Sequence, residues 1–224
     1  MNSTETSKQK YLALETSSPC LSLALGNETE VVRSWSGAHM WRHAESLLEG
    51  IETILKKQRW TWNQLTGVAV SVGPGSFTGI RIGLSAARAL GQFLHIPVVG
   101  VSALETLAFG QKGTVINPTI DALREHWYVG LYQRQAQGRW KRLQPDACLP
   151  REAVQQVRSL WRKKFGALTL VESGDLHGHY PRASDVLLLA QPRLAKAGSE
   201  SYKQVLPLYL RDATAVERRK ALRK

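Results

Sequence analysis

The sequence GVAVSVGPGSFTGIRIGLSAARALG, residues 67–91, combines a strand, a turn and a helix in one run. Its first six residues, 67–72, are apolar and partly β-branched, which is typical of a strand buried on both faces of a parallel sheet. The glycines and the proline of residues 73–79 predict a rigid turn, in which Ser76 or Thr78 caps a helix that runs to about residue 94. A buried strand that passes through a tight turn into a helix indicates an α/β fold.

The residues around this run predict a first domain over residues 11–111. Alternating apolar residues predict strands, and an apolar stripe with a period of 3.6 residues predicts helices. By these signs the expected elements are strands at 11–15, 20–25 and 31–35, a helix at 44–58, the strand and helix of 67–94, a strand from 97 and a helix from 103.

The second half of the chain repeats this order more faintly over residues 112–210. Each half opens with a strand that ends in an acid, Glu15 or Asp121, followed by a turn and another strand. The expected elements are strands at 115–121 and 127–132, a helix near 151–164, a strand at 168–172 and a helix near 183–197. This weak repeat predicts an α/β, duplicated βββαβα fold of the actin-like, ribonuclease H-like class (ASKHA) with a reduced second domain, although the coarse order also fits a doubly wound nucleotide-binding fold. Residues 1–10 are expected to form a disordered tail, and residues 211–224 a basic one.

The composition excludes several classes of protein. The chain has 224 residues, of which 43% are hydrophobic and 21% charged, and this excludes disorder throughout. No run reaches the roughly 18 apolar residues of a membrane-spanning helix, and the first ten residues lack the apolar core of a signal peptide. We therefore expect a cytoplasmic protein that does not bind a membrane. Cys20 and Cys148 alone cannot form a disulfide framework or a four-ligand zinc site.

Basic residues are concentrated in two segments of the chain, whose net charge is +12. Residues 1–133 hold 11 basic and 10 acidic residues, whereas residues 134–164 hold nine and two, and residues 211–224 hold six and two. A solvated helix face accounts for such residues in many proteins, but this asymmetry exceeds what a generic surface requires.

The glycine-rich run GPGSFTG, residues 73–79, shares some features with a phosphate-binding loop. Glycines allow backbone N–H groups to approach an anion at a helix N-terminus. However, the run lacks the Lys-[Ser/Thr] ending of a P-loop and the spacing of a dinucleotide site, so a turn with a helix cap explains it better.

Small residues recur every four positions in the helix that follows, at Gly79, Gly83, Ala87 and Gly91. Each glycine costs about 0.8–1 kcal/mol of helix stability relative to Ala, so close packing is expected in return. This row packs either on the chain's own sheet or against a helix of another chain. In the second case, Gly83→Leu is expected to disrupt pairing more than folding.

His39 and His43 are spaced as H-x-x-x-H, which on a helix would bring two imidazoles together as metal ligands. No Glu stands in the HExxH position and no third ligand is marked, so we expect no metal site there. The sequence contains no GxSxG elbow and no complete catalytic set.

The run 67–91, followed by IPVVGVSALETLA from Ile96, resembles the most diagnostic segment of the TsaB (YeaZ) family. The resemblance extends over ALETSSPCLSLAL from Ala13, HAESLL from His43, IDALREHWYVGLY from Ile120 and PLYLR at 207–211. It covers residues 11–132 closely and the rest loosely. This family supplies a partner subunit for making N6-threonylcarbamoyladenosine at position 37 of tRNAs that read ANN codons.

The resemblance implies a non-catalytic scaffold subunit that does not itself transfer the threonylcarbamoyl group. It implies pairing with a TsaD-type catalytic subunit, which carries the metal and the nucleotide, and assembly with a TsaE-type ATPase. This chain alone is therefore expected to bind no cofactor. The pairing surface would lie on the helices over residues 43–55 and 78–90, facing either the TsaD-type subunit or a second copy of the chain. The interface residues so implied are His43, Leu47, Leu48, Ile51, Gly79, Gly83, Ala86, Ala87 and Leu90.

The first strand departs from the family pattern, because it ends in Glu-Thr-Ser from Glu15 where the family usually has Asp-Thr-Ser. The longer carboxylate changes the reach toward phosphate or magnesium, so we expect no ATP binding by the isolated chain. Two alternatives remain open. One is an independent actin-like phosphotransferase or ATPase that uses Glu15, Asp121 and the loop 73–79, and the other is a glycoprotease-like metallohydrolase at His39 and His43.

The complex that the resemblance implies must also hold a tRNA, whose phosphates attract clustered Lys and Arg through counterion release. The basic segments are therefore expected to add weak, sequence-independent tRNA affinity. The expected contacts are Arg158, Arg162, Lys163 and Lys164.

Overall fold

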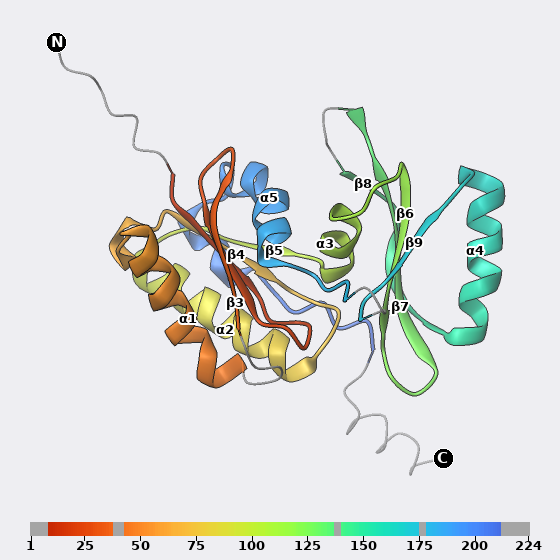
Figure 1. Cartoon of the computed structure of the whole chain (residues 1–224), viewed down its shortest axis with the longest axis horizontal. Coiled ribbons are helices and arrows are strands. Elements are labelled where there is room, and N and C mark those ends of the chain that lie inside the picture. The colour runs from red at the N-terminus through yellow and green to blue at the C-terminus, as the bar shows by residue number, and fades with distance from the viewer. Residues whose placement is uncertain (1–8, 38–42, 137–139, 175–177, 212–224) are drawn as a thin grey trace.

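The computed structural model describes residues 9–37, 43–136, 140–174 and 178–211. Within these ranges the strands form one five-stranded and one four-stranded sheet, with two helices between the sheets (Figure 1). The elements of the first half are β1 (Tyr11–Glu15), β2 (Ser22–Gly26), β3 (Val31–Ser36), α1 (His43–Gln58), η1 (Trp62–Gln64), β4 (Gly67–Ser71), α2 (Phe77–Leu94), β5 (Val98–Val101) and α3 (Ala103–Phe109). Those of the second half are β6 (Val115–Asp121), β7 (His126–Arg134), β8 (Trp140–Pro150), α4 (Arg151–Phe165), β9 (Thr169–Glu172), α5 (Ala183–Leu194) and η3 (Ser199–Lys203).

The two halves share one topology. The first sheet has the order β3-β2-β1-β4-β5 and the second has the order β8-β7-β6-β9, so each places its third, second, first and fourth strands side by side. In both sheets the first strand runs antiparallel to the second and parallel to the fourth. The helices follow the same plan, since α1 and α2 match α4 and α5 in chain order. The predicted duplicated βββαβα plan is confirmed, and the second half is reduced because it lacks a fifth strand.

Both faces of the first sheet are buried, and the side chains of its strands are larger on one face than on the other. Leucines and valines face α1 and α2, at Leu12, Leu14, Leu23, Leu25, Val68 and Val70. Alanines face α5, at Ala13, Ala24 and Ala69, which lets this helix lie close to the strands. The continuous apolar runs of β1 and β4 thus arise because both faces are covered.

Helices α1 and α2 form where the sequence predicts them. The apolar stripe of α1 buries Leu47, Ile51 and Ile54 in the core, while its charged residues remain exposed. Helix α2 begins at Phe77 because Ser76 Oγ accepts a hydrogen bond from Gly79 N at 3.1 Å.

The strand β8 was not predicted. Its sequence, WKRLQPDACLP, is polar and contains Pro145, so it lacks the alternation that marks a half-buried strand. It forms because it pairs along β7, and of its residues only Asp146 is buried. Its presence completes the repeat between the two halves.

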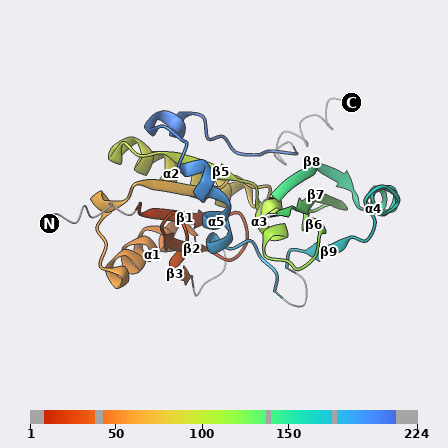
Figure 2. The same cartoon turned by 90° about the horizontal axis from the view of Figure 1, so that it is seen from above.

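Two helices cross between the predicted domains, 11–111 and 112–210. Helix α3 packs on the second sheet, through Leu104, Leu107 and Ala108. Helix α5 returns to the first sheet, and the chain after it stays there, because Leu208 N donates to Val72 O at 2.8 Å. The layers in Figures 1 and 2 are therefore α1 with α2, the first sheet, α5, α3, the second sheet and α4. Each half exchanges one helix with the other, which no local pattern could show.

Candidate functional site

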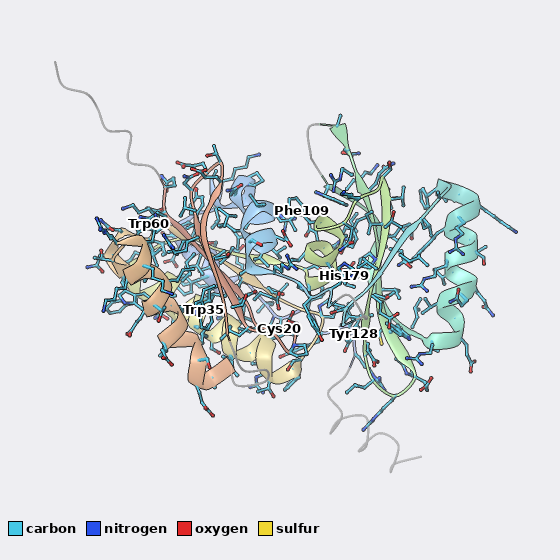
Figure 3. The ribbon with its side chains drawn as sticks, viewed as in Figure 1. Cys20, Trp35, Trp60, Phe109, Tyr128 and His179 are labelled. Atoms are coloured by element: carbon cyan, nitrogen blue, oxygen red, sulfur yellow. The ribbon has the colours of Figure 1, made fainter. Side chains whose placement is uncertain are left out.

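A cleft of about 740 Å³ lies between the two halves. In Figure 3, the labelled Tyr128 and His179 lie in the middle of the molecule, between the sheets. The lining comes from the turn after β1, the start of α2, the β6–β7 hairpin, the segment between β9 and α5, and the last described residues. These lining residues are Ser17, Ser18, Pro19, Gly75, Ser76, Phe77, Ile80, Ile120, Asp121, Ala122, Leu123, Arg124, Tyr128, Ser173, Gly174, Tyr180, Pro181, Leu208, Tyr209 and Arg211.

Glu15 is fully buried and does not line the cleft. Its Oε1 accepts hydrogen bonds from Ser17 N and Ser17 Oγ, both at 2.6 Å, and Ser71 Oγ donates to Ser17 Oγ at 3.2 Å. Its Oε2 has no hydrogen-bond partner among the described residues. Burial raises the pKa of the Glu15 carboxyl, and the hydrogen bonds from Ser17 only partly oppose this. Ser17 therefore lies between the Glu15 carboxylate and the cleft.

Asp121 lies on the rim of the cleft and is exposed. Its Oδ1 accepts a hydrogen bond from Leu123 N at 2.7 Å, within a hairpin whose residues 123–125 all have positive φ. Arg211 donates to Ala122 O at 3.1 Å and so ties the last described residues to this hairpin. Glu15 and Asp121 thus do not form a pair of carboxylates in the cleft.

Aromatic side chains form much of the cleft wall, which the sequence did not predict. The rings of Phe77 and Tyr209 stack with their centroids 5.1 Å apart, and the Arg81 guanidinium lies 5.2 Å from the Phe77 ring. Because Phe77 opens α2 and Tyr209 lies near the end of the chain, only the folded structure brings them together.

Most of the predicted interface residues are buried inside the chain. Leu47, Ile51, Gly79, Gly83 and Ala87 are all buried, so these residues expose little surface to a partner in the folded chain. Of the row of small residues, a Cβ on Gly83 would overlap Thr16, and one on Gly91 would lie 3.0 Å from Tyr202 Cβ. The row packs on the chain's own structure, and the assignment of these five residues to a partner surface stays a prediction that their burial does not support.

The other predicted interface residues remain accessible. Leu48 is 62% exposed, and Ala86 and Leu90 are partly buried. They lie on α1 and α2, which pack side by side on one face of the first sheet (Figure 1). His43 begins α1, but its side chain and His39 lie outside the described residues. Pairing through this face stays a prediction.

The predicted tRNA contacts divide into two groups. Arg162, Lys163 and Lys164 are exposed in the last turn of α4. Arg158 is half-buried, and its Nε donates to Asn117 Oδ1 at 2.7 Å, so it is not part of a solvated basic face. Burial lowers the pKa of the Arg158 guanidinium, with the charge of Glu172 acting in the opposite direction.

The described residues bring no three His, Cys, Asp or Glu side chains together as a set of metal ligands. None of the helices in the described ranges is long and apolar enough to cross a membrane.

Comparison with known proteins gives consistent similarities. Residues 40–172 match the family model described as TsaD: tRNA N6-adenosine threonylcarbamoyltransferase. The chain is 29% identical to the tRNA threonylcarbamoyladenosine biosynthesis protein TsaB of Escherichia coli (strain K12), over 92% of this chain and 96% of the relative. It is 30% identical to the TsaB protein of Buchnera aphidicola subsp. Acyrthosiphon pisum, over 69% of this chain and 71% of the relative.

A solved structure from Pseudomonas aeruginosa, described as an uncharacterized protein with similarity to peptidase YEAZ, superposes with a TM-score of 0.75. It is 28% identical and covers 91% of this chain and 100% of its own. This match over almost the whole chain agrees with the α/β, actin-like fold described above.

Proposed function

Since the chain belongs to the family of that model, and within it to the TsaB (YeaZ) proteins of tRNA threonylcarbamoyladenosine biosynthesis, we propose that it acts there as a non-catalytic scaffold subunit. In this role it pairs with a TsaD-type catalytic subunit and joins a TsaE-type ATPase, which bind the ATP and the metal of the reaction. The product is N6-threonylcarbamoyladenosine at position 37 of tRNAs that read ANN codons. The chain works in the cytoplasm, where those tRNAs are.

The observation that carries this proposal is the exposure of Leu48. Leu48 is a large aliphatic side chain that is 62% exposed among the charged residues on the outer side of α1, and this favours a contact with another protein. Ala86 and Leu90 offer further apolar surface on the adjacent helix α2. The same face also allows two copies of the chain to pair as a homodimer when the catalytic subunit is absent.

The buried position of Glu15 supports a non-catalytic role. An actin-like phosphotransferase needs carboxylates that reach the metal and the phosphates in the cleft. Here Ser17 covers Glu15, and only Asp121 reaches the rim. Calorimetric titration of the isolated chain with ATP and magnesium is expected to give no measurable heat of binding, and micromolar affinity would favour the phosphotransferase instead.

Two matched substitutions test the pairing surface. Leu48→Asp places a charge on α1, and Leu160→Asp places the same charge on α4 at a site of nearly equal exposure, 62% against 64%. We expect Leu48→Asp to weaken pairing with the TsaD-type subunit by about tenfold or more, the usual effect of changing a contact near the centre of an interface. Leu160→Asp is expected to pair like the wild type. Sedimentation of each mixture measures this, and full pairing by Leu48→Asp would contradict the proposed surface.

The basic end of α4 is the proposed tRNA contact within the assembled complex. Arg162, Lys163 and Lys164 are exposed and free to approach phosphates without base recognition. Changing all three to Ala is expected to lower the slope of tRNA affinity against salt. An identical slope would leave these residues as a solvated helix face.

A further inference from the structure

A second pocket lies on the opposite side of the second sheet from the cleft, beneath α4. Its volume is about 170 Å³, and it is lined by Trp127, Arg151, Val154, Gln155, Arg158 and Glu172. The pocket lies where the parallel strands β6 and β9 end, since Thr119 pairs with Glu172 there. The carboxyl ends of parallel strands are the usual place for ligands in α/β sheets.

Hydrogen bonds to the second sheet hold Arg158 in this pocket. Its Nε donates to Asn117 Oδ1 at 2.7 Å, and Asn117 is fully buried and donates its Nδ2 to Gly130 O at 2.8 Å. This chain of hydrogen bonds fixes the guanidinium group on a central strand. The described residues give Arg158 no ion pair, although Glu172 lies near enough to influence its charge. Glu172 lines the same pocket and partly offsets the cost of burying this cation, and a bound anion would offset more of it.

Arg151 forms a second wall of the pocket. Its guanidinium lies 5.1 Å from the centre of the Trp127 ring and 3.9 Å from Glu125 Oε2. Arg151, Gln155 and Arg158 are spaced i, i+4 and i+7 on α4, so all three project from the same face of the helix. Two guanidinium groups and an amide thus converge on one small space.

The size and the donors of the pocket select the ligand. A water molecule occupies about 30 Å³ of liquid, so the pocket has room for a small anion and not for a nucleoside. The planar, forked donors of arginine match the oxygens of a phosphate. We propose that this pocket binds one phosphate group, supplied by an RNA backbone or by free phosphate. The RNA source rests on the proposed function, and it would give α4 one fixed phosphate contact beside the exposed cations of its last turn.

Substitutions of Glu172 and Arg158 should change the affinity for phosphate in opposite directions. Its carboxylate opposes a bound phosphate, so Glu172→Gln is expected to strengthen binding, whereas Arg158→Gln is expected to weaken it. Arg59→Gln is the matched control, because it removes the same charge from an exposed site of the first half, away from the pocket and from the proposed tRNA contacts. A general loss of stability would weaken binding in both pocket variants and could not produce a gain in one of them.

The first experiment titrates the full chain with inorganic phosphate at low salt and follows the amide resonances of α4. We expect Arg158→Gln to weaken phosphate binding by about tenfold and Glu172→Gln to strengthen it severalfold, as the loss or gain of a charged contact would. Arg59→Gln is expected to change it less than about twofold. Equal phosphate affinity in all four proteins, or no binding by the wild type and by Glu172→Gln, would overturn the proposal.

The second experiment identifies the source of the phosphate. For tRNA bound to the assembled complex, Arg158→Gln is expected to reduce the salt slope by about 1 if a backbone phosphate occupies the pocket. An unchanged slope, together with altered binding of inorganic phosphate, assigns the pocket to free phosphate. Pairing with the TsaD-type subunit is measured on the same samples. Intact pairing without phosphate binding would remove this proposal and leave the scaffold function in place.

Discussion

Thr16 and Gly83 touch where the end of β1 meets α2. Thr16 Oγ1 donates a hydrogen bond to Gly79 O at 2.7 Å, and a Cβ on Gly83 would overlap the same hydroxyl group. Helix α2 can therefore lie on the turn after β1 only because position 83 has no side chain. The contact places the start of α2 beside Ser17, which forms part of the cleft.

Gly83→Ala is expected to destabilise the chain on its own. The added methyl group forces Thr16 to move, and overpacking of this kind costs about 1–3 kcal/mol. The gain in helix propensity from Gly to Ala returns at most about 1 kcal/mol. Urea unfolding of the isolated chain measures the difference, with Ser85→Ala on the exposed side of α2 as the control. If Gly83→Ala unfolds at the same urea concentration as the wild type, the contact with Thr16 is not close.

Tyr132→Phe tests the buried network that joins the two halves. Asp146 of β8 accepts hydrogen bonds from Tyr132 Oη at 2.5 Å and from Ser102 Oγ at 2.8 Å, just before α3. Burial and the charge of Asp146 raise the pKa of the Tyr132 phenol, so it remains a donor at neutral pH. Removing the hydroxyl group leaves Asp146 with one fewer donor, and we expect the free energy of unfolding to fall by about 1–3 kcal/mol.

The control for this substitution is Tyr209→Phe, since Tyr209 is 46% exposed. It is expected to change stability by less than about 0.5 kcal/mol. Equal effects of the two substitutions in urea unfolding would show that the Tyr132 hydroxyl group contributes nothing specific.

The sequence predicts the elements of this fold much better than it predicts their partners. The run 67–91 shows its strand, cap and helix because the residues that form them are neighbours in the chain. The row at Gly79, Gly83 and Ala87 shows only that something lies close to it, and Thr16 belongs to a distant segment. The strand β8 is held by its pairing with β7, so its own residues carry no strand signal.

The candidate site shows the same division. The basic character of α4 is visible in the sequence, but the hydrogen bond that draws Arg158 inward depends on Asn117, which is 41 residues away in the chain. Likewise, an acid at the end of the first strand predicts a cleft carboxylate, and the turn through Ser17 buries it instead. A contact between distant segments decides the direction of the Arg158 side chain, whereas the local turn decides that of Glu15.

Asp185 should make the stability of the chain depend on pH. It lies in the first turn of α5, and burial raises the pKa of its carboxyl from 3.8 to about 6. Between these values the folded chain binds more protons than the unfolded chain, so the free energy of unfolding falls as the pH rises. The loss is complete above the folded pKa and amounts to at most about 3 kcal/mol.

Asp185→Asn removes this dependence. We expect the variant to match the wild type near about pH 4 and to exceed its stability near about pH 7. Glu152→Gln, which removes an exposed carboxylate from the first turn of α4, controls for the loss of a charge at a helix N-terminus. Urea unfolding at the two pH values measures the change, and a variant that is less stable than the wild type at the higher pH would contradict the burial penalty.

Glu15→Gln separates a structural carboxyl from a catalytic one. Burial raises the pKa of Glu15. As the pH rises above the ordinary pKa of a glutamate, ionisation of this side chain therefore destabilises the folded chain increasingly. The amide keeps an oxygen to accept from Ser17 and cannot ionise, so the variant should gain stability over the wild type with rising pH. Because Ser17 stands between Glu15 and the cleft, we also expect the variant to pair with the TsaD-type subunit and to support tRNA modification at the rate of the wild type. Both effects are measured on one preparation, by urea unfolding and by modified-nucleoside analysis of the reaction products. A variant that folds normally and abolishes modification would mean that the carboxylate reaches the reacting groups, and it would restore the phosphotransferase alternative.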